Sequence, residues 1–413
     1  MRGASAWRIP DDVPGEMRRI SQGVHGTASI ASRIEHTVPD KRDVLFCVAL
    51  TIAACAIFLI AKSWSVPLWK DVVAFDGKYY LDIAKHGYRF SGDIQERQNI
   101  SFLPLAPAAI AAVRWMLPGH NDFLKIFFLG AVSLFGILFG FFMLLQDCVG
   151  KQAARLTALV WALGPLALYH FVGYTEPLFA LGTVWCLVAL RRDWRWTASL
   201  IAGISMLGRP QAAVLVLFVG IEVLRRAEWR PGRLLEVRRM LKLVLLALPL
   251  MAFASWMALA FHDSALYVNS GAAWRNYYSS IGAYLPFFRG VGYFFQGVSA
   301  ESASLTDWKV MLGTVSLVIA ALALALCSDA PRRERWMYVA LLVFLMLVES
   351  FDLNNFSRHT LYLAPWSIIL GCALAKSPGQ EWRKWLAVMP FLALSILINV
   401  IAIMRFYRWE WVS

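Results

Sequence analysis

Apolar runs that approach or reach the length of a membrane span recur along the whole chain of 413 residues. A transmembrane helix needs about 17–25 mostly apolar residues. The runs cover residues 44–64, 123–146, 156–173, 176–191, 241–261, 308–327, 336–350, 360–375 and 385–404. Hydrophobic residues make up 59% of the chain and charged residues only 16%, whereas a soluble domain keeps about 25% of its residues charged. The pattern predicts an all-α, polytopic membrane helix bundle.

Two further apolar stretches are interrupted. Residues 101–117 contain two prolines and Arg114, and residues 197–224 are broken by Gly208-Arg209-Pro210. Non-helical backbone is tolerated at membrane depth where it lines a cavity enclosed by protein. We therefore expect the first stretch to be re-entrant or half-buried, and the second to form two short helices that turn back at Gly208-Arg209-Pro210.

The basic residues give the expected orientation. The net charge is +13, and Lys and Arg collect in short clusters between apolar runs, as they do in loops retained on the cytoplasmic side. This rule leaves four stretches on the outer side: 65–100, 174–176, 263–306 and 351–359. We expect them to assemble one polar cavity. No basic stripe is interleaved with aromatic residues along a helix face, so the charge does not indicate nucleic-acid binding.

The chain divides into a polar tail and one membrane domain. Residues 1–43 are predicted to be a disordered cytoplasmic tail, and residues 44–413 a transmembrane domain with outer loops 65–100 and 263–306. The first apolar run begins too late for an ordinary cleaved signal peptide. Five of the six cysteines lie inside apolar runs without metal-ligand spacing, which predicts neither a disulfide framework nor a zinc site.

Five short motifs follow one another along the chain. They are Phe75-Asp76-Gly77-Lys78-Tyr79-Tyr80-Leu81-Asp82-Ile83-Ala84-Lys85-His86-Gly87-Tyr88, Phe102-Leu103-Pro104-Leu105-Ala106-Pro107, Tyr174-Thr175-Glu176-Pro177-Leu178-Phe179-Ala180, Gly208-Arg209-Pro210 and Ser357-Arg358-His359-Thr360-Leu361-Tyr362-Leu363-Ala364-Pro365. In this order they resemble the glycosylphosphatidylinositol mannosyltransferase 2 family and its bacterial relatives, which belong to the GT-C class of polytopic glycosyltransferases. The chain departs from the family pattern at Phe75, Leu103, Pro177 and His359, where the family usually has Trp, an aromatic residue, Ser and Tyr.

The resemblance implies a GT-C fold and an inverting transfer of a sugar, with mannose expected, on the non-cytoplasmic face. The donor would be a polyprenyl-phosphate sugar and the acceptor a lipid or glycan. Such a donor can dispense with a divalent ion, and the outer side has no short Asp-x-Asp pair, so we expect no metal and no other cofactor. The chain stops at Ser413 without a eukaryotic retention signal, which favours a bacterial plasma membrane.

Two other functions remain open from the sequence. Broken helices with a buried Arg also suit a lipid or glycolipid transporter or flippase with alternating access. The lack of repeated halves and the clustering of acids on the outer side argue against that alternative. The other open function is that of a non-catalytic subunit that only scaffolds a partner transferase.

Asp76 is the predicted catalytic residue. A carboxylate at the boundary between water and membrane can act as a general base on the acceptor hydroxyl, and the resemblance gives the acid of the first outer loop this role. The competing interpretation is a solvated acid or a helix cap. Asp71 and Asp82 are weaker candidates that we expect to be structural.

Arg209 and Glu176 are the next candidates. An ionisable residue within the membrane is functional by default, and a guanidinium matches a phosphate, so Arg209 is predicted to bind the donor phosphate. It can equally be a structural partner of an acid such as Glu176. Glu176 opens an apolar run, where the helix dipole alone would favour an acid.

Four further residues complete the predicted substrate-binding set. Arg358 and His359 precede a late apolar run on the outer side, where a cation can neutralise charge on the leaving phosphate; an interfacial, snorkelling Arg is the alternative. Lys78 and His86 add positive charge to the first outer loop, although most loop charges are merely solvated.

Overall fold

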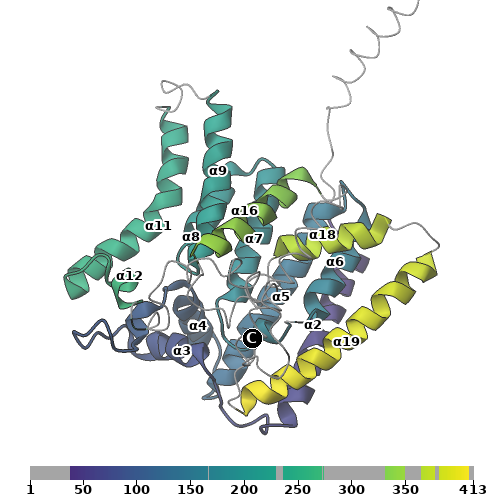
Figure 1. The fold of residues 1–413 in the computed structure, drawn as a ribbon, viewed down its shortest axis with the longest axis horizontal. Coiled ribbons are helices and arrows are strands. Elements are labelled where there is room, and N and C mark those ends of the chain that lie inside the picture. The colour runs from purple at the N-terminus through teal and green to yellow at the C-terminus, as the bar shows by residue number, and fades with distance from the viewer. Residues whose placement is uncertain are drawn as a thin grey trace, which may run out of the picture. The chain divides into compact units, whose positions relative to one another are not determined.

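The computed structural model describes residues 38–165, 167–228, 236–271, 273, 331–348, 364–376 and 381–408. This part of the chain is helical and contains no strand (Figure 1). In chain order the elements are α2 (Lys41–Ser63), α3 (Asp76–His86), η1 (Asn99–Ser101), α4 (Leu105–Met116), α5 (Asp122–Leu145), α6 (Lys151–Leu163), η2 (Ala167–His170), α7 (Glu176–Arg191), α8 (Arg195–Ser205), η3 (Pro210–Ala212), α9 (Ala213–Arg226), α11 (Val237–Phe261), α12 (Leu266–Ser270), α16 (Arg332–Val348), α18 (Ala364–Lys376) and α19 (Glu381–Tyr407).

Four of the described helices are long and apolar enough to cross a membrane: α2, α5, α11 and the Val388–Tyr407 part of α19. They coincide with four of the predicted spans. The helices α16 and α18 occupy two more predicted spans and are 17 and 13 residues long. The predicted span 308–327 and the predicted tail up to residue 37 lie outside the described residues.

The first span begins before its apolar run. Asp40 and Asp43 form a reciprocal capping box that starts α2 at Lys41, and such a box satisfies two otherwise unpaired backbone N–H groups. The buried Asp43 also pairs with Lys151 (2.7 Å) and Arg155 (3.4 Å) at the start of α6. The first turns of α2 and α6 therefore lie at the same end of the bundle.

The prediction of one continuous span over 156–173 is wrong. Helix α6 ends at Leu163, and Gly164 is extended because the following Pro165 disfavours a helical residue before it. Asn399 of α19 pairs with backbone groups on both sides of this helix break. Its side-chain amide N–H donates to the Gly164 carbonyl, and its side-chain carbonyl accepts from Leu168 N–H at 3.1 Å. The break thus depends on a buried side chain 235 residues away in sequence.

The prediction of a helical hairpin over 197–224 is confirmed. Helices α8 and α9 pack against each other and are joined at Arg209 and η3. At the open end, Arg226 on α9 contacts Asp193, directly before α8, with an N–O distance of 2.9 Å. The start of α8 and the end of α9 therefore meet at one end of the hairpin, and the turn at Arg209 lies at the other end.

Candidate active site

The sharp turn before α3 places Asp76 at the start of that helix. Phe75 has a positive φ of 51°, an unusual conformation for a residue with a side chain. Its ring packs against Phe406 of α19, with the centroids 5.0 Å apart. Asp76 is the first residue of α3, after the cap position, and is half-buried. Its carboxylate therefore lies in the positive field of the helix N-terminus.

Glycine at position 77 allows α3 to approach the chain just before α7. A Cβ atom on Gly77 would lie 2.8 Å from the Val172 carbonyl oxygen and 3.0 Å from Val73 Cγ1. Gly173, which follows Val172, has a φ of +81°, a conformation that favours glycine. This close approach fixes the Asp76 turn against the segment that leads into Glu176.

Arg209 and Glu176 form a buried ion pair. The distance from Arg209 Nη1 to Glu176 Oε1 is 2.8 Å, and the two side chains are 11% and 4% exposed. Arg209 also donates from Nε to Gln211 Oε1 at 3.2 Å and from Nη1 to Thr175 Oγ1 at 3.5 Å. The tip of the α8–α9 hairpin is thereby joined to the N-terminus of α7, and Glu176 is the acid that holds Arg209.

Tyr80 connects this pair to Asp76. Tyr80 follows Asp76 by four residues on α3, so the two lie on one helix face. Burial raises the pKa of the Tyr80 phenol; Asp76 and then Glu176 raise it further, while Arg209 and a hydrogen bond with Thr175 lower it. All three charged groups therefore act on one buried hydroxyl. Asp76, Glu176 and Arg209, all of them candidates from the sequence, lie within electrostatic range of Tyr80.

An aromatic surface and a second cation lie beside Asp76. Tyr79 stacks on Phe102, with ring centroids 4.9 Å apart and an interplanar angle of 15°. Burial raises the pKa of Tyr79, Arg97 lowers it and Asp76 raises it, so Arg97 lies within electrostatic range of this ring. Neither Arg97 nor Tyr80 was predicted from the sequence, although the four-residue spacing from Asp76 was a usable signal for Tyr80.

Lys78 and His86 do not join this group. The Lys78 side chain is exposed, with Nζ 5.1 Å from the Tyr79 ring centroid. His86 ends α3, ten residues after Asp76 and about 15 Å away along the helix. Its Nδ1 contacts Asp82 Oδ1 at 2.9 Å. The other two predicted residues, Arg358 and His359, lie outside the described residues.

The structural interpretation of Asp71 and Asp82 is confirmed. Asp71 Oδ1 accepts from the Phe123 N–H at 2.7 Å, at the start of α5. Asp82 Oδ2 accepts from Asn99 Nδ2 at 2.7 Å. Although burial acts to raise it, the pKa of Asp82 is lowered by its hydrogen bonds with His86 and Asn99. These acids hold loop segments in place.

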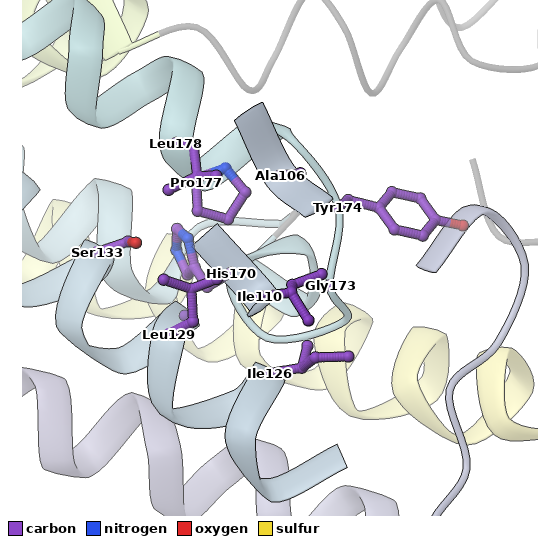
Figure 2. Close-up of a pocket in the computed structure, with 11 residues that line it drawn as sticks. Ala106, Ile110, Ile126, Leu129, Ser133, His170, Gly173, Tyr174, Pro177 and Leu178 are labelled. Carbon is purple, nitrogen blue, oxygen red and sulfur yellow. The ribbon is translucent and has the colours of Figure 1, made fainter. Parts of the chain in front are cut away.

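A small cavity lies behind the site, between α4, α5 and the start of α7 (Figure 2). Its lining is mostly apolar, and His170 and Ser133 face it from the same side. His170 Nε2 lies 3.1 Å from the Trp161 carbonyl oxygen. The volume of about 10 Å³ is the room that one water molecule needs. A cavity of this volume does not hold a sugar or a lipid chain.

The part of the chain that the structure describes has no group of three or more His, Cys, Asp or Glu residues that could hold a metal ion. The free thiols Cys47, Cys55, Cys148, Cys186 and Cys372 form no disulfide with one another.

Comparison with known proteins decides the family. A family model described as mannosyltransferase (PIG-V) matches residues 36–272, more than half of the chain and all of the site described above. The chain belongs to this family. It is 29% identical to human GPI alpha-1,6-mannosyltransferase 2 over 154 residues, which cover 35% of this chain and 30% of the human protein.

The fold comparison points the same way. The structure of ArnT from Cupriavidus metallidurans bound to undecaprenyl phosphate is similar with a TM-score of 0.53 at 15% identity, covering 84% of this chain and 63% of ArnT. Both matches span less than two thirds of the relative's length. ArnT is a GT-C glycosyltransferase, so the predicted all-α GT-C fold is confirmed. The predicted family is confirmed by the family model.

Proposed function

We propose that this mannosyltransferase-family chain transfers a sugar, most simply mannose, from a polyprenyl-phosphate donor to a lipid or glycan acceptor, with inversion. Membership of the family supports the reaction class. The similar ArnT structure is described as bound to undecaprenyl phosphate, which supports a polyprenyl-phosphate donor. The reaction would take place on the non-cytoplasmic face of a bacterial plasma membrane.

Asp76 is the proposed general base. Its carboxylate would take the proton of the acceptor hydroxyl while the hydroxyl oxygen attacks the anomeric carbon. The bond from that carbon to the phosphate oxygen breaks, and its electron pair leaves with the lipid phosphate. The observation that carries the proposal is geometric: Gly77 holds the start of α3, and with it Asp76, against the segment that leads into Glu176, and Glu176 holds Arg209 at 2.8 Å.

Arg209 is the proposed phosphate-binding residue, and Glu176 its positioning partner. A guanidinium has five N–H donors in a fixed plane, and here Glu176 and Gln211 orient that plane through Nη1 and Nε. Arg358 and His359 are proposed to stabilise the leaving phosphate. Lys78 and His86 would act only through their positive charge in the outer loop.

The test compares Asp76→Asn with Asp93→Asn, which removes an exposed acid from the same outer loop. Each full-length variant is incubated in membranes with radiolabelled polyprenyl-phosphate mannose and mixed acceptors. Loss of a general base lowers the rate by about 100-fold or more, so Asp76→Asn should form almost no product, while Asp93→Asn stays near the wild-type rate.

Full activity of Asp76→Asn would refute the assignment of the base. The same membranes also test the flippase alternative. If the wild-type protein moves the labelled lipid across the bilayer without forming a glycosylated product, the transferase proposal is wrong.

A further inference from the structure

A group of cations gathers at the open end of the α8–α9 hairpin, where α11 begins. Helix α11 packs against both α8 and α9 (Figure 1). We call this group the hairpin-base cluster. Its members are Arg195 at the start of α8, Arg226 at the end of α9, and Arg238, Arg239 and Lys242 in the first turns of α11.

The acids of this region neutralise only part of the cluster. Asp193 contacts both Arg195 (2.7 Å) and Arg226 (2.9 Å), and Arg226 also contacts Glu222 at 2.7 Å. Arg239 contacts Glu236 at 3.1 Å. Arg238 and Lys242 have no acidic partner within salt-bridge distance among the described residues. The cluster therefore keeps an excess of positive charge.

Lys242 is the cation with the least favourable surroundings. Its Nζ lies 4.9 Å from the centroid of the Trp196 ring. Arg195, Arg239 and Arg238 repel it electrostatically, and Asp193 attracts it. The N-termini of α8 and α11 add positive potential at the same end, where cations are unfavourable. An anion bound between these groups would relieve the repulsion.

Exposed apolar side chains place the cluster at the membrane surface. Trp194 and Trp196 are exposed beside it, and so are Leu241 and Val244 on α11. Tryptophan is enriched at the level of the lipid headgroups, and basic residues next to a span attract anionic lipids. We infer that the hairpin-base cluster binds the phosphate of an anionic phospholipid headgroup, principally through Arg238 and Lys242.

The chain offers a matched control at another helix start. Lys41 and Arg42 are an exposed basic pair in the first turn of the α2 span, where the neighbouring cations Lys151 and Arg155 are paired with Asp40 and Asp43. The experiment compares Arg238→Gln/Lys242→Gln with Lys41→Gln/Arg42→Gln in purified full-length protein. Dioleoyl phosphatidylglycerol is titrated in detergent and bound lipids are counted by native mass spectrometry, with dioleoyl phosphatidylcholine as the neutral probe.

The wild type should bind phosphatidylglycerol more tightly than phosphatidylcholine. Two juxtamembrane cations are worth about tenfold or more in affinity for an anionic lipid, so the Arg238/Lys242 variant should lose that factor and the Lys41/Arg42 variant should not. Equal loss in both variants, or none in either, overturns the inference. So does displacement of the lipid by millimolar inorganic phosphate, which would indicate a site for a free anion.

A second measurement on the wild-type protein covers the case in which the variant does not fold. Raising the salt from 0.05 to 0.5 M should weaken phosphatidylglycerol binding, because screening shortens the range of the attraction. Binding that is insensitive to salt would overturn the electrostatic site.

Discussion

The Arg209–Glu176 pair allows a quantitative test of the site. We consider Glu176→Gln and Arg209→Met, singly and together. Each single change leaves one charge buried without its partner, since both side chains are largely excluded from solvent. The double change removes both charges while keeping the volumes similar.

The expected magnitudes follow from this burial. Breaking a buried pair by removing one partner costs about 3–5 kcal/mol, whereas replacing both partners can be close to neutral. Each single variant should therefore lose about 3 kcal/mol of unfolding free energy, and the double variant less than the sum, with a coupling of at least about 2 kcal/mol.

The free energies can be measured by reversible SDS-induced unfolding in mixed micelles. The pair Arg225 and Glu222 on α9 is the control, because Arg225 is 61% exposed and the N–O distance of 3.0 Å is similar. Such an exposed pair should show a coupling below about 1 kcal/mol. If the Arg209 and Glu176 effects add within about 0.5 kcal/mol, the pair is not a coupled buried unit and our reasoning is wrong.

Three further predictions concern stability, activity and pH. Asn399→Leu should lower the unfolding free energy by about 2–4 kcal/mol, because two buried backbone groups lose their partner; the exposed change Leu397→Ile should leave the melting temperature unaltered. Tyr80→Phe should reduce the initial transfer rate about fivefold, the value of one hydrogen bond. An unchanged rate would show that the Tyr80 hydroxyl does not contribute to the transfer. The lowered pKa of Asp82 stabilises the fold above the unfolded value of about 3.9. That stability is lost as pH falls through the folded pKa. Asp82→Asn should therefore weaken the dependence of the melting temperature on pH below pH 4.

Local features of the sequence predicted much of the architecture. The apolar runs located the long helices, and the interruption at Arg209 between two basic clusters predicted the hairpin, because charge and helix-breaking residues act locally. The helix break at Gly164 could also have been predicted from Pro165. The length of the apolar run favoured a continuous span instead.

The parts that could not be predicted depend on contacts between distant segments. Asn399 lies in an apolar helix, and nothing in its neighbours indicates that it caps a break near Gly164. The convergence of Asp76, Glu176 and Arg209 on Tyr80 requires three segments to meet, and spacing alone does not fix their distances. Arg97 was not singled out from the sequence, because its proximity to Tyr79 depends on how the loop folds back.

The hairpin formed by α8 and α9 has the geometry of a lever arm. Arg209 is at its tip, and the Asp193–Arg226 contact closes its base. Helix α8 has 11 residues and so is about 16 Å long, which means that one degree of tilt at the base moves the tip by about 0.3 Å. Tilting by a few degrees at the level of one set of headgroups would thus change the Arg209–Glu176 distance by the difference between a hydrogen-bonded and a separated pair.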